Sequence, residues 1–302
     1  MTPRINLRDR LIDPKSPERR PRRAAYALPT LFTAGNLFLG FLAILKSIEG
    51  ALWASSGNLG HNPHWQLAAQ VIGAAVFLDG LDGRIARMTN TVSEFGRELD
   101  SLADVISFGI APAVLAFVWG FYFLDPAISG DFRDYLNQAG YFAVFLFVMC
   151  GAARLARFNI TANPVPANPG HPGRKYFVGL PIPAAAGIVA AIVYAANSAP
   201  LRWWPLVASW IGLNMILALL MISNWRYRSF KDLNLLSPLS FKSVVLMGMC
   251  FYLLLNFSKV FLLVLSILYV GSGIVIRVGG LLKRAGRPPH APKPQPQAGS
   301  PS

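Results

Sequence analysis

The stretch FLDGLDGRIARMTNTVSEFGRELDSLADVISFG, residues 77–109, places four aspartates at the ends of two apolar segments. Asp79 and Asp82 are three residues apart, and Asp100 and Asp104 are four apart, so each pair shares one face of a helix. The polar segment MTNTVSE between the pairs can turn the chain. Two adjacent antiparallel helices would therefore direct four carboxylates towards one point.

The composition indicates a membrane protein. Of the 302 residues, 54% are hydrophobic and 14% are charged, which is too apolar for an ordinary soluble domain. Apolar runs recur at lengths close to the roughly 20 residues that a helix needs to cross a bilayer. We predict an all-α polytopic membrane protein with about eight transmembrane helices. Their expected positions are 29–49, 65–83, 103–123, 138–153, 178–197, 203–223, 241–256 and 260–276.

Lysine and arginine are distributed unevenly between the two sides of this arrangement. Twenty-four of the 28 fall in the N-terminal tail, in three loops at 84–97, 154–175 and 226–242, and in the C-terminal stretch that starts at Arg277. Four would face the other side: Lys46, Arg133, Arg202 and Lys259. Because basic loops stay in the cytoplasm, both termini are expected to be cytoplasmic. The net charge of +14 then favours anionic membrane lipids as partners over nucleic acid.

The two ends of the chain differ from the rest in composition. Residues 1–27 are basic and polar, which predicts a flexible tail near the anionic leaflet. Residues 279–302 are basic and rich in proline, which predicts a disordered tail. Residues 28–278 between them are predicted to form one transmembrane catalytic domain.

Four carboxylates near hydrocarbon require a compensating charge. Nearby arginines can neutralise any one of them as an ion pair. That explanation fails for the whole group, because six of the 14 acidic residues lie between positions 79 and 104. Divalent cations suit oxygen-rich sites, and four carboxylates can hold two ions in the arrangement that serves displacement at phosphorus. We therefore expect a divalent metal, Mg²⁺ or Mn²⁺, with two ions bound.

Eight residues also fit the pattern D-x2-D-G-x2-A-R-x8-G-x3-D-x3-D without departure. They are Asp79, Asp82, Gly83, Ala86, Arg87, Gly96, Asp100 and Asp104. The chain therefore resembles the CDP-alcohol phosphotransferase family, whose members transfer a phosphoalcohol from a CDP-alcohol to a second alcohol and release CMP. The resemblance implies the fold of that family and a homodimer.

The resemblance also implies a role for each matched position. Metal coordination would come from Asp79, Asp82 and Asp100, with Asp104 as a further contact. The CDP group would be contacted by Gly83, Ala86 and Arg87, and Gly96 leaves room for a phosphorylated ligand to approach the backbone. Asp104 would be the general base, because a primary alcohol is a poor nucleophile until a carboxylate accepts its proton.

Stretches outside the motif resemble the bacterial and archaeal phosphatidylserine synthases within that family. These stretches are LPTLFTAGNLFLGFLAI at 28–44, ARLARFN at 153–159 and YFVGLPIPAAAG at 176–187. The likeness implies CDP-diacylglycerol and L-serine as substrates. It also implies an integral protein of the prokaryotic inner (plasma) membrane, with its active site at the cytoplasmic face.

Residues flanking the motif are candidates for substrate contacts. Arg154 and Arg157 offer guanidinium groups for the carboxylate of an amino-acid acceptor. Ordinary helix-end arginines are an equally good interpretation of either residue alone. Further acceptor contacts are expected from Asn159 and Lys175. Thr33 and Asn36 could touch the nucleotide or pack against a neighbouring helix.

Two alternative functions remain open from the sequence. The same chemistry could use another acceptor, such as glycerol phosphate, inositol phosphate or choline, because arginines bind phosphate as well as carboxylate. A cation-coupled transporter would also place carboxylates in a membrane. Transporter sites tend to lie near the midplane, however, and these aspartates cluster at helix ends beside arginines.

Overall fold

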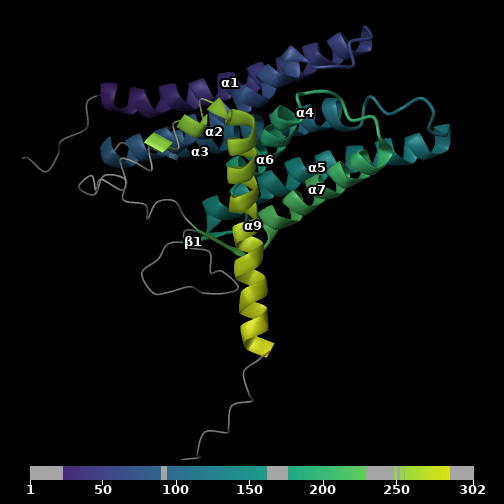
Figure 1. The fold of residues 1–302 in the computed structure, drawn as a ribbon. Coiled ribbons are helices and arrows are strands. Elements are labelled where there is room, and N and C mark those ends of the chain that lie inside the picture. Colours follow the sequence, from purple (N-terminus) through teal and green to yellow (C-terminus); the bar gives the residue numbers. More distant parts are fainter. Residues whose placement is uncertain are drawn as a thin grey trace, which may run out of the picture.

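The computed structural model describes residues 23–89, 94–161, 176–228, 248–249, 252–254 and 256–285. Over these residues the chain is largely helical (Figure 1). The first half contains α1 (Arg23–Ser55), α2 (Pro63–Thr89), α3 (Glu94–Asp104), the π-helix η1 (Val105–Ile110) and α4 (Ala111–Gly120). The second half contains α5 (Gly130–Ile160), α6 (Ile182–Ala195), α7 (Trp204–Ile222) and α9 (Ser258–Ala285).

Five helical stretches of the described chain are long and apolar enough to cross a membrane: Leu31–Ser55, Phe95–Gly120, Gly130–Ile160, Trp204–Ile222 and Ser258–Gly279. The 14 residues of α6 extend about 21 Å, which is short of a bilayer core of about 30 Å. The expected helix at 241–256 lies mostly outside the described residues. The total of eight spans and the cytoplasmic termini therefore stay predictions.

The third expected span begins earlier than the sequence indicated. Instead of starting at residue 103, one continuous helix covers Phe95–Gly120, with η1 in its middle. Asp100 and Asp104 therefore lie within this helix. Pro112, near the start of α4, has no backbone N–H to offer the carbonyl of Phe108, which favours the wider hydrogen-bond ladder of a π-helix just before it.

Two helices extend into stretches that the sequence assigned to the tails. α1 begins at Arg23 and α9 ends at Ala285. Both ends are rich in strong helix formers, in RAAYAL at one end and LLKRA at the other. The helical part of the chain is therefore longer than the predicted domain, 28–278.

A small sheet departs from the all-α prediction. β1 (Tyr176–Val178) and β2 (Arg226–Arg228) pair antiparallel, with Phe177 opposite Tyr227. The backbone N–H of Gly179, which has a φ of 77°, continues this connection by donating to the carbonyl of Trp225 at 2.8 Å. The sheet thus ties the entry into α6 to the exit from α7, and it satisfies backbone groups that no helix serves.

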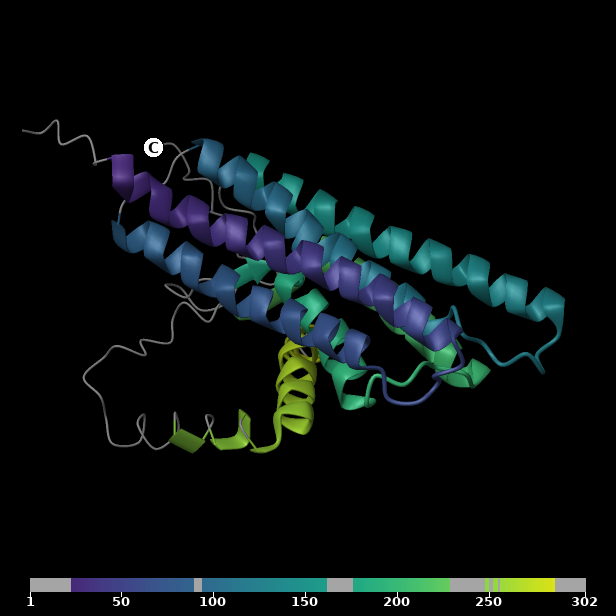
Figure 2. The ribbon, with the colours of Figure 1, turned by 90° about the horizontal axis from the view of Figure 1, so that it is seen from above.

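α1 and α2 form an antiparallel hairpin and lie side by side in both views (Figure 2). Gly50 permits this close approach, because a Cβ atom there would lie 2.3 Å from Cδ1 of the Trp65 ring. The indole N–H of Trp65 also donates to the carbonyl of Ser47 at 3.0 Å. Trp65 is therefore the residue that locks the two helices together near their connection.

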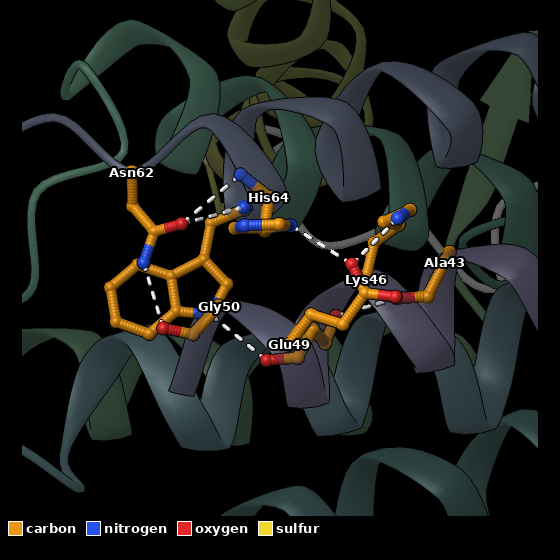
Figure 3. Close-up of polar contacts among 8 residues, drawn as sticks. Ala43, Lys46, Glu49, Gly50, Asn62 and His64 are labelled. Atoms are coloured by element: carbon orange, nitrogen blue, oxygen red, sulfur yellow. Dashed lines mark hydrogen bonds and ion pairs between the residues drawn. The ribbon is translucent and has the colours of Figure 1, made fainter. Parts of the chain in front are cut away.

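The α1–α2 connection is held by a compact set of polar contacts (Figure 3). The carboxamide oxygen of Asn62 accepts the backbone N–H groups of His64 at 3.1 Å and Trp65 at 3.3 Å, while its nitrogen donates to the carbonyl of Gly50 at 2.8 Å. Glu49 contacts both Lys46 at 2.6 Å and the His64 ring at 2.9 Å. Asn62 thus acts as the N-terminal cap of α2 and anchors it to α1.

The other three basic residues that the sequence places opposite the basic loops also have partners. Arg202 pairs with Asp125 at 3.4 Å, and Arg133 donates to the backbone carbonyl of Asp125 at 3.2 Å. Lys259 donates to the side-chain oxygen of Asn197 at 2.6 Å. Each of the four cations therefore has at least one acceptor within the protein, and Nε of Arg133 is buried without a partner among the described residues.

α9 runs crosswise to α1, α2, α5 and α7 in both views (Figures 1 and 2). It packs on α6 and on β2. Near its start, the hydroxyl groups of Ser258 and Tyr194 are 3.0 Å apart. One turn beyond Tyr269, the backbone of Gly273 meets the ring of Tyr227, so α9 reaches both ends of α6.

Candidate active site

Three of the four predicted aspartates meet in the structure. Asp79 comes from α2, and Asp100 and Asp104 come from α3. One carboxylate oxygen of each lies within 4.8 Å of those of the other two. Asp104 is buried and the other two are half-buried. The side chain of Asp82 lies outside the described part of the chain, so its contribution stays a prediction.

The three carboxylates fit a divalent cation. Oxygen ligands of a single ion at roughly 2.0–2.6 Å lie about 3 to 5 Å from one another, which is the spacing found here. In addition, Oδ1 of Asp100 is buried and has no hydrogen-bond partner among the described residues. A buried carboxylate oxygen is costly without a partner, and a metal ion would supply one.

Close packing behind Asp104 fixes the aspartates relative to α1. A Cβ atom at Gly40 would lie 2.4 Å from Oγ of Ser107, so only glycine lets α1 approach η1 this closely. The hydroxyl of Ser107 donates to the backbone carbonyl of Asn36 at 2.9 Å. The helix that carries Asp104 is therefore clamped to α1 one turn after that residue.

Thr33 and Asn36 are both buried on one face of α1. Neither side-chain polar atom of Asn36 has a hydrogen-bond partner within the described chain. A fully buried amide with two unmet groups close to η1 is what a polar ligand would satisfy. The structure therefore keeps Asn36 as a candidate for nucleotide contact.

The three candidate acceptor residues on α5 have different surroundings. Arg154 is 8% exposed, and its Nε has no hydrogen-bond partner among described atoms. Its guanidinium lies within electrostatic reach of Asp104. Arg157 instead donates to the backbone carbonyl of Ile222 at 2.9 Å and Asn159 donates to Ser101 at 3.0 Å. Of these three residues, only Arg154 has a buried side-chain nitrogen without a hydrogen-bond partner among the described residues.

The remaining predicted contacts are largely beyond what the structure describes. The side chains of Ala86 and Arg87 and the whole of Lys175 fall outside the described residues. The backbone of α2 continues through Gly83, and Gly96 is half-buried on α3. Their assignment to the nucleotide or the acceptor stays a prediction.

Sequence reasoning missed two tyrosines that the structure brings to this site. Tyr269 on α9 lies within electrostatic reach of Arg154, and its ring centroid is 6.0 Å from that of Tyr227 on β2. A signal was present in the sequence, because Tyr269 is the one tyrosine in the apolar run of α9. What the sequence did not reveal is that α9 crosses the bundle and packs on α6 and β2.

Comparison with known proteins agrees with this geometry. The family model for CDP-alcohol phosphatidyltransferases matches residues 26–218, and the chain belongs to that family. It is 37% identical over 211 residues to the CDP-diacylglycerol–serine O-phosphatidyltransferase of Helicobacter pylori strain J99, covering 70% of this chain and 76% of that protein.

Two further relatives, matched over shorter stretches, carry related names. The archaetidylserine synthase of Methanothermobacter thermautotrophicus is 39% identical over 162 residues, which cover 53% of this chain and 54% of that protein. The CDP-diacylglycerol–serine O-phosphatidyltransferase of Bacillus subtilis is 35% identical over 156 residues, or 52% of this chain and 69% of that protein. Family membership favours the transferase interpretation of the aspartates over the transporter interpretation.

Proposed function

We propose that the protein transfers the phosphatidyl group of CDP-diacylglycerol to the hydroxyl of L-serine, giving phosphatidylserine and CMP. The observation that carries this proposal is the convergence of Asp79, Asp100 and Asp104 beside a buried arginine. The names of the relatives, among them those from Helicobacter pylori and Bacillus subtilis, support serine as the acceptor.

The proposed reaction is a direct displacement at phosphorus. The serine oxygen forms a bond to the β-phosphorus of the donor while the bond from that phosphorus to the CMP oxygen breaks. Asp104 accepts the hydroxyl proton, so no covalent enzyme intermediate is needed. The three aspartates would hold a divalent metal that neutralises charge on the pyrophosphate and on the departing CMP.

Arg154 is the better of the two arginines for the acceptor's carboxylate. A guanidinium group binds a carboxylate through two parallel hydrogen bonds, and burial strengthens such contacts. Arg157 is already engaged by backbone carbonyls at the end of α7 and by β1. We therefore assign Arg157 to holding the end of α5 in place and Arg154 to substrate.

The donor would be held by residues of α1 and α2. The side-chain amide of Asn36 is proposed to contact the nucleotide, together with the motif residues Gly83 and Arg87. A site at the cytoplasmic membrane surface lets the acyl chains stay in hydrocarbon while the CDP group faces water. A second copy of the chain is expected as partner in a homodimer.

The direct test is CMP release by purified protein in vesicles that contain CDP-diacylglycerol. Release should require both serine and Mg²⁺ or Mn²⁺, and it should yield a serine phospholipid. Asp104→Asn should lower the rate by about 10²- to 10⁴-fold, as loss of a general base does. Asp131→Asn, at an exposed position in the first turn of α5, is the matched control and should leave the rate unchanged.

A panel of acceptors separates the chemistry from its substrate. Glycerol phosphate, inositol phosphate, choline and ethanolamine would be offered in place of serine. Release driven by one of these and not by serine would replace the acceptor and keep the mechanism. Absence of metal-dependent release with every acceptor, in protein that is folded, would overturn the proposal.

A further inference from the structure

The starting observation is a buried nitrogen of Arg154, Nε, that could donate a further hydrogen bond. Its guanidinium is almost fully buried, yet Nε has no hydrogen-bond partner among the residues described. Leaving a buried charged donor unmet is costly, so an acceptor group is missing beside it. Asp104 lies on one element near this guanidinium and Tyr269 lies on another, which places Arg154 between α3 and α9.

The position of α9 beside Arg154 is fixed by a tight contact. Tyr227 is fully buried, and a Cβ atom at position 273 would lie 2.3 Å from its ring atoms Cε1 and Cζ. Gly273 therefore lets α9 press against β2, and the ring of Tyr227 in turn packs against the ring of Tyr269. Burial, and next the neighbouring Tyr269, raise the pKa of Tyr227 to about 12, so this ring packs as a neutral phenol.

We propose that Tyr269 is an acceptor-binding residue: its hydroxyl and the guanidinium of Arg154 together hold the carboxylate of the acceptor. This inference rests on the proposed function. It adds α9 to the site as the helix that contributes a residue next to the acceptor. Tyr269 lies within electrostatic reach of the buried arginine, and its half-buried side chain leaves it accessible to a small molecule. The phenol O–H and the guanidinium N–H groups donate, and the carboxylate oxygens accept.

The primary test is Tyr269→Phe, which removes one hydroxyl and keeps the ring that packs on Tyr227. The KM for L-serine should rise by roughly 10- to 100-fold, the effect expected for losing a hydrogen bond to a charged group. The KM for CDP-diacylglycerol should stay unchanged. Tyr135→Phe makes the same chemical change at an exposed position on α5, and it should alter neither constant.

Competing ligands show whether the lost contact involves the carboxylate. 3-Hydroxypropionate keeps the carboxylate and the hydroxyl of serine, whereas ethanolamine keeps the amine and the hydroxyl. Inhibition of serine turnover by 3-hydroxypropionate should weaken in Tyr269→Phe, and inhibition by ethanolamine should not. Equal weakening with both compounds would overturn the assignment to the carboxylate.

A second variant tests the helix rather than the hydroxyl. Gly273→Ala should push α9 away from β2 and raise the KM for serine, in protein whose thermal unfolding confirms that it is folded. A raised KM in Gly273→Ala with an unchanged KM in Tyr269→Phe would overturn the role of Tyr269. Failure of the wild type to release CMP with serine would instead overturn the proposed function, so the two failures are distinct.

Discussion

The two ends of the helical bundle differ in how their charged side chains are paired. At the α1–α2 connection, Glu49 contacts both Lys46 and His64, and nearby Asp125 pairs with Arg202. At the aspartate end, three carboxylates crowd together, and both Asp100 and Arg154 keep a buried polar atom without a partner among the described residues. At the first end the acidic side chains pair with cations of the chain, whereas at the other end three carboxylates are crowded together.

This difference indicates which charges are structural and which serve a ligand. A charge near a bilayer needs compensation, and at the first end the protein itself provides it. At the second end like charges are brought together, which no folding requirement explains. Substitutions at the aspartate end should therefore affect ligand binding and turnover, and substitutions at the α1–α2 connection should affect stability alone.

The largest effect is expected at Asp100. Asp100→Asn keeps the size of the side chain and removes the charge that would hold the proposed metal. Loss of several kcal/mol of charge stabilisation corresponds to a fall in the CMP release rate on the order of 10³-fold. Asp125→Asn is the matched control at the other end, and a comparable loss there would abolish the contrast between the two ends.

The gain in protein stability on metal binding should depend on the aspartate end and not on the other end. If folded protein binds the ion and unfolded protein does not, an ion concentration of about 100 times Kd adds about 2.7 kcal/mol to the stability of the wild type. Thermal unfolding in detergent, with Mg²⁺ or Mn²⁺ against chelator, measures this gain. Asp125→Asn should keep the gain and Asp100→Asn should lose it. An equal gain in both variants would place the ion elsewhere.

A stability effect without an effect on turnover is expected at Gly50. The methyl group of Gly50→Ala would collide with the Trp65 ring, and overpacking of this kind costs about 1–3 kcal/mol. The thermal midpoint should fall, while CMP release per folded molecule stays at the wild-type value. A lowered rate at full folding would mean that the α1–α2 connection communicates with the site.

The smallest effect is expected at Arg202. Its side chain and that of Asp125 are 46% and 44% exposed, and pairs of this kind contribute only about 0.2–1 kcal/mol. Arg202→Gln should therefore change the stability by less than about 1 kcal/mol and the turnover not at all. A loss of several kcal/mol would show that the first end depends on its ion pairs more than exposure suggests.

The site was more predictable from the sequence than the arrangement of the helices around it. Asp100 and Asp104 were identifiable because helical spacing places them on one face, and Asp79 because the intervening polar stretch can turn the chain. The same local reasoning overlooked the sheet formed by β1 and β2, since three-residue strands carry no detectable period. It also started the third span at residue 103, because hydropathy falls where the aspartates lie.

Contacts between elements distant in sequence could not be predicted. Arg154 and Arg157 cannot be told apart in ARLARFN. In the fold, Arg157 donates to backbone carbonyls, whereas Nε of Arg154 has no partner among the described residues. Tyr269 shares no motif with either arginine. Its proximity to Arg154 depends on the crosswise course of α9, which is determined by packing at Gly273 and not by local propensity.

The π-helix η1 has a further consequence for how this protein tolerates change. A π turn holds about one residue more than an α turn, and one residue corresponds to a rotation of about 100° around the helix axis. The number of residues in η1 therefore sets how the aspartates that precede it are rotated, about the helix axis, relative to the buried face of α4 that follows it. The number of residues in 105–110 therefore matters as well as their side chains, because a one-residue deletion would turn the carboxylates away from α2.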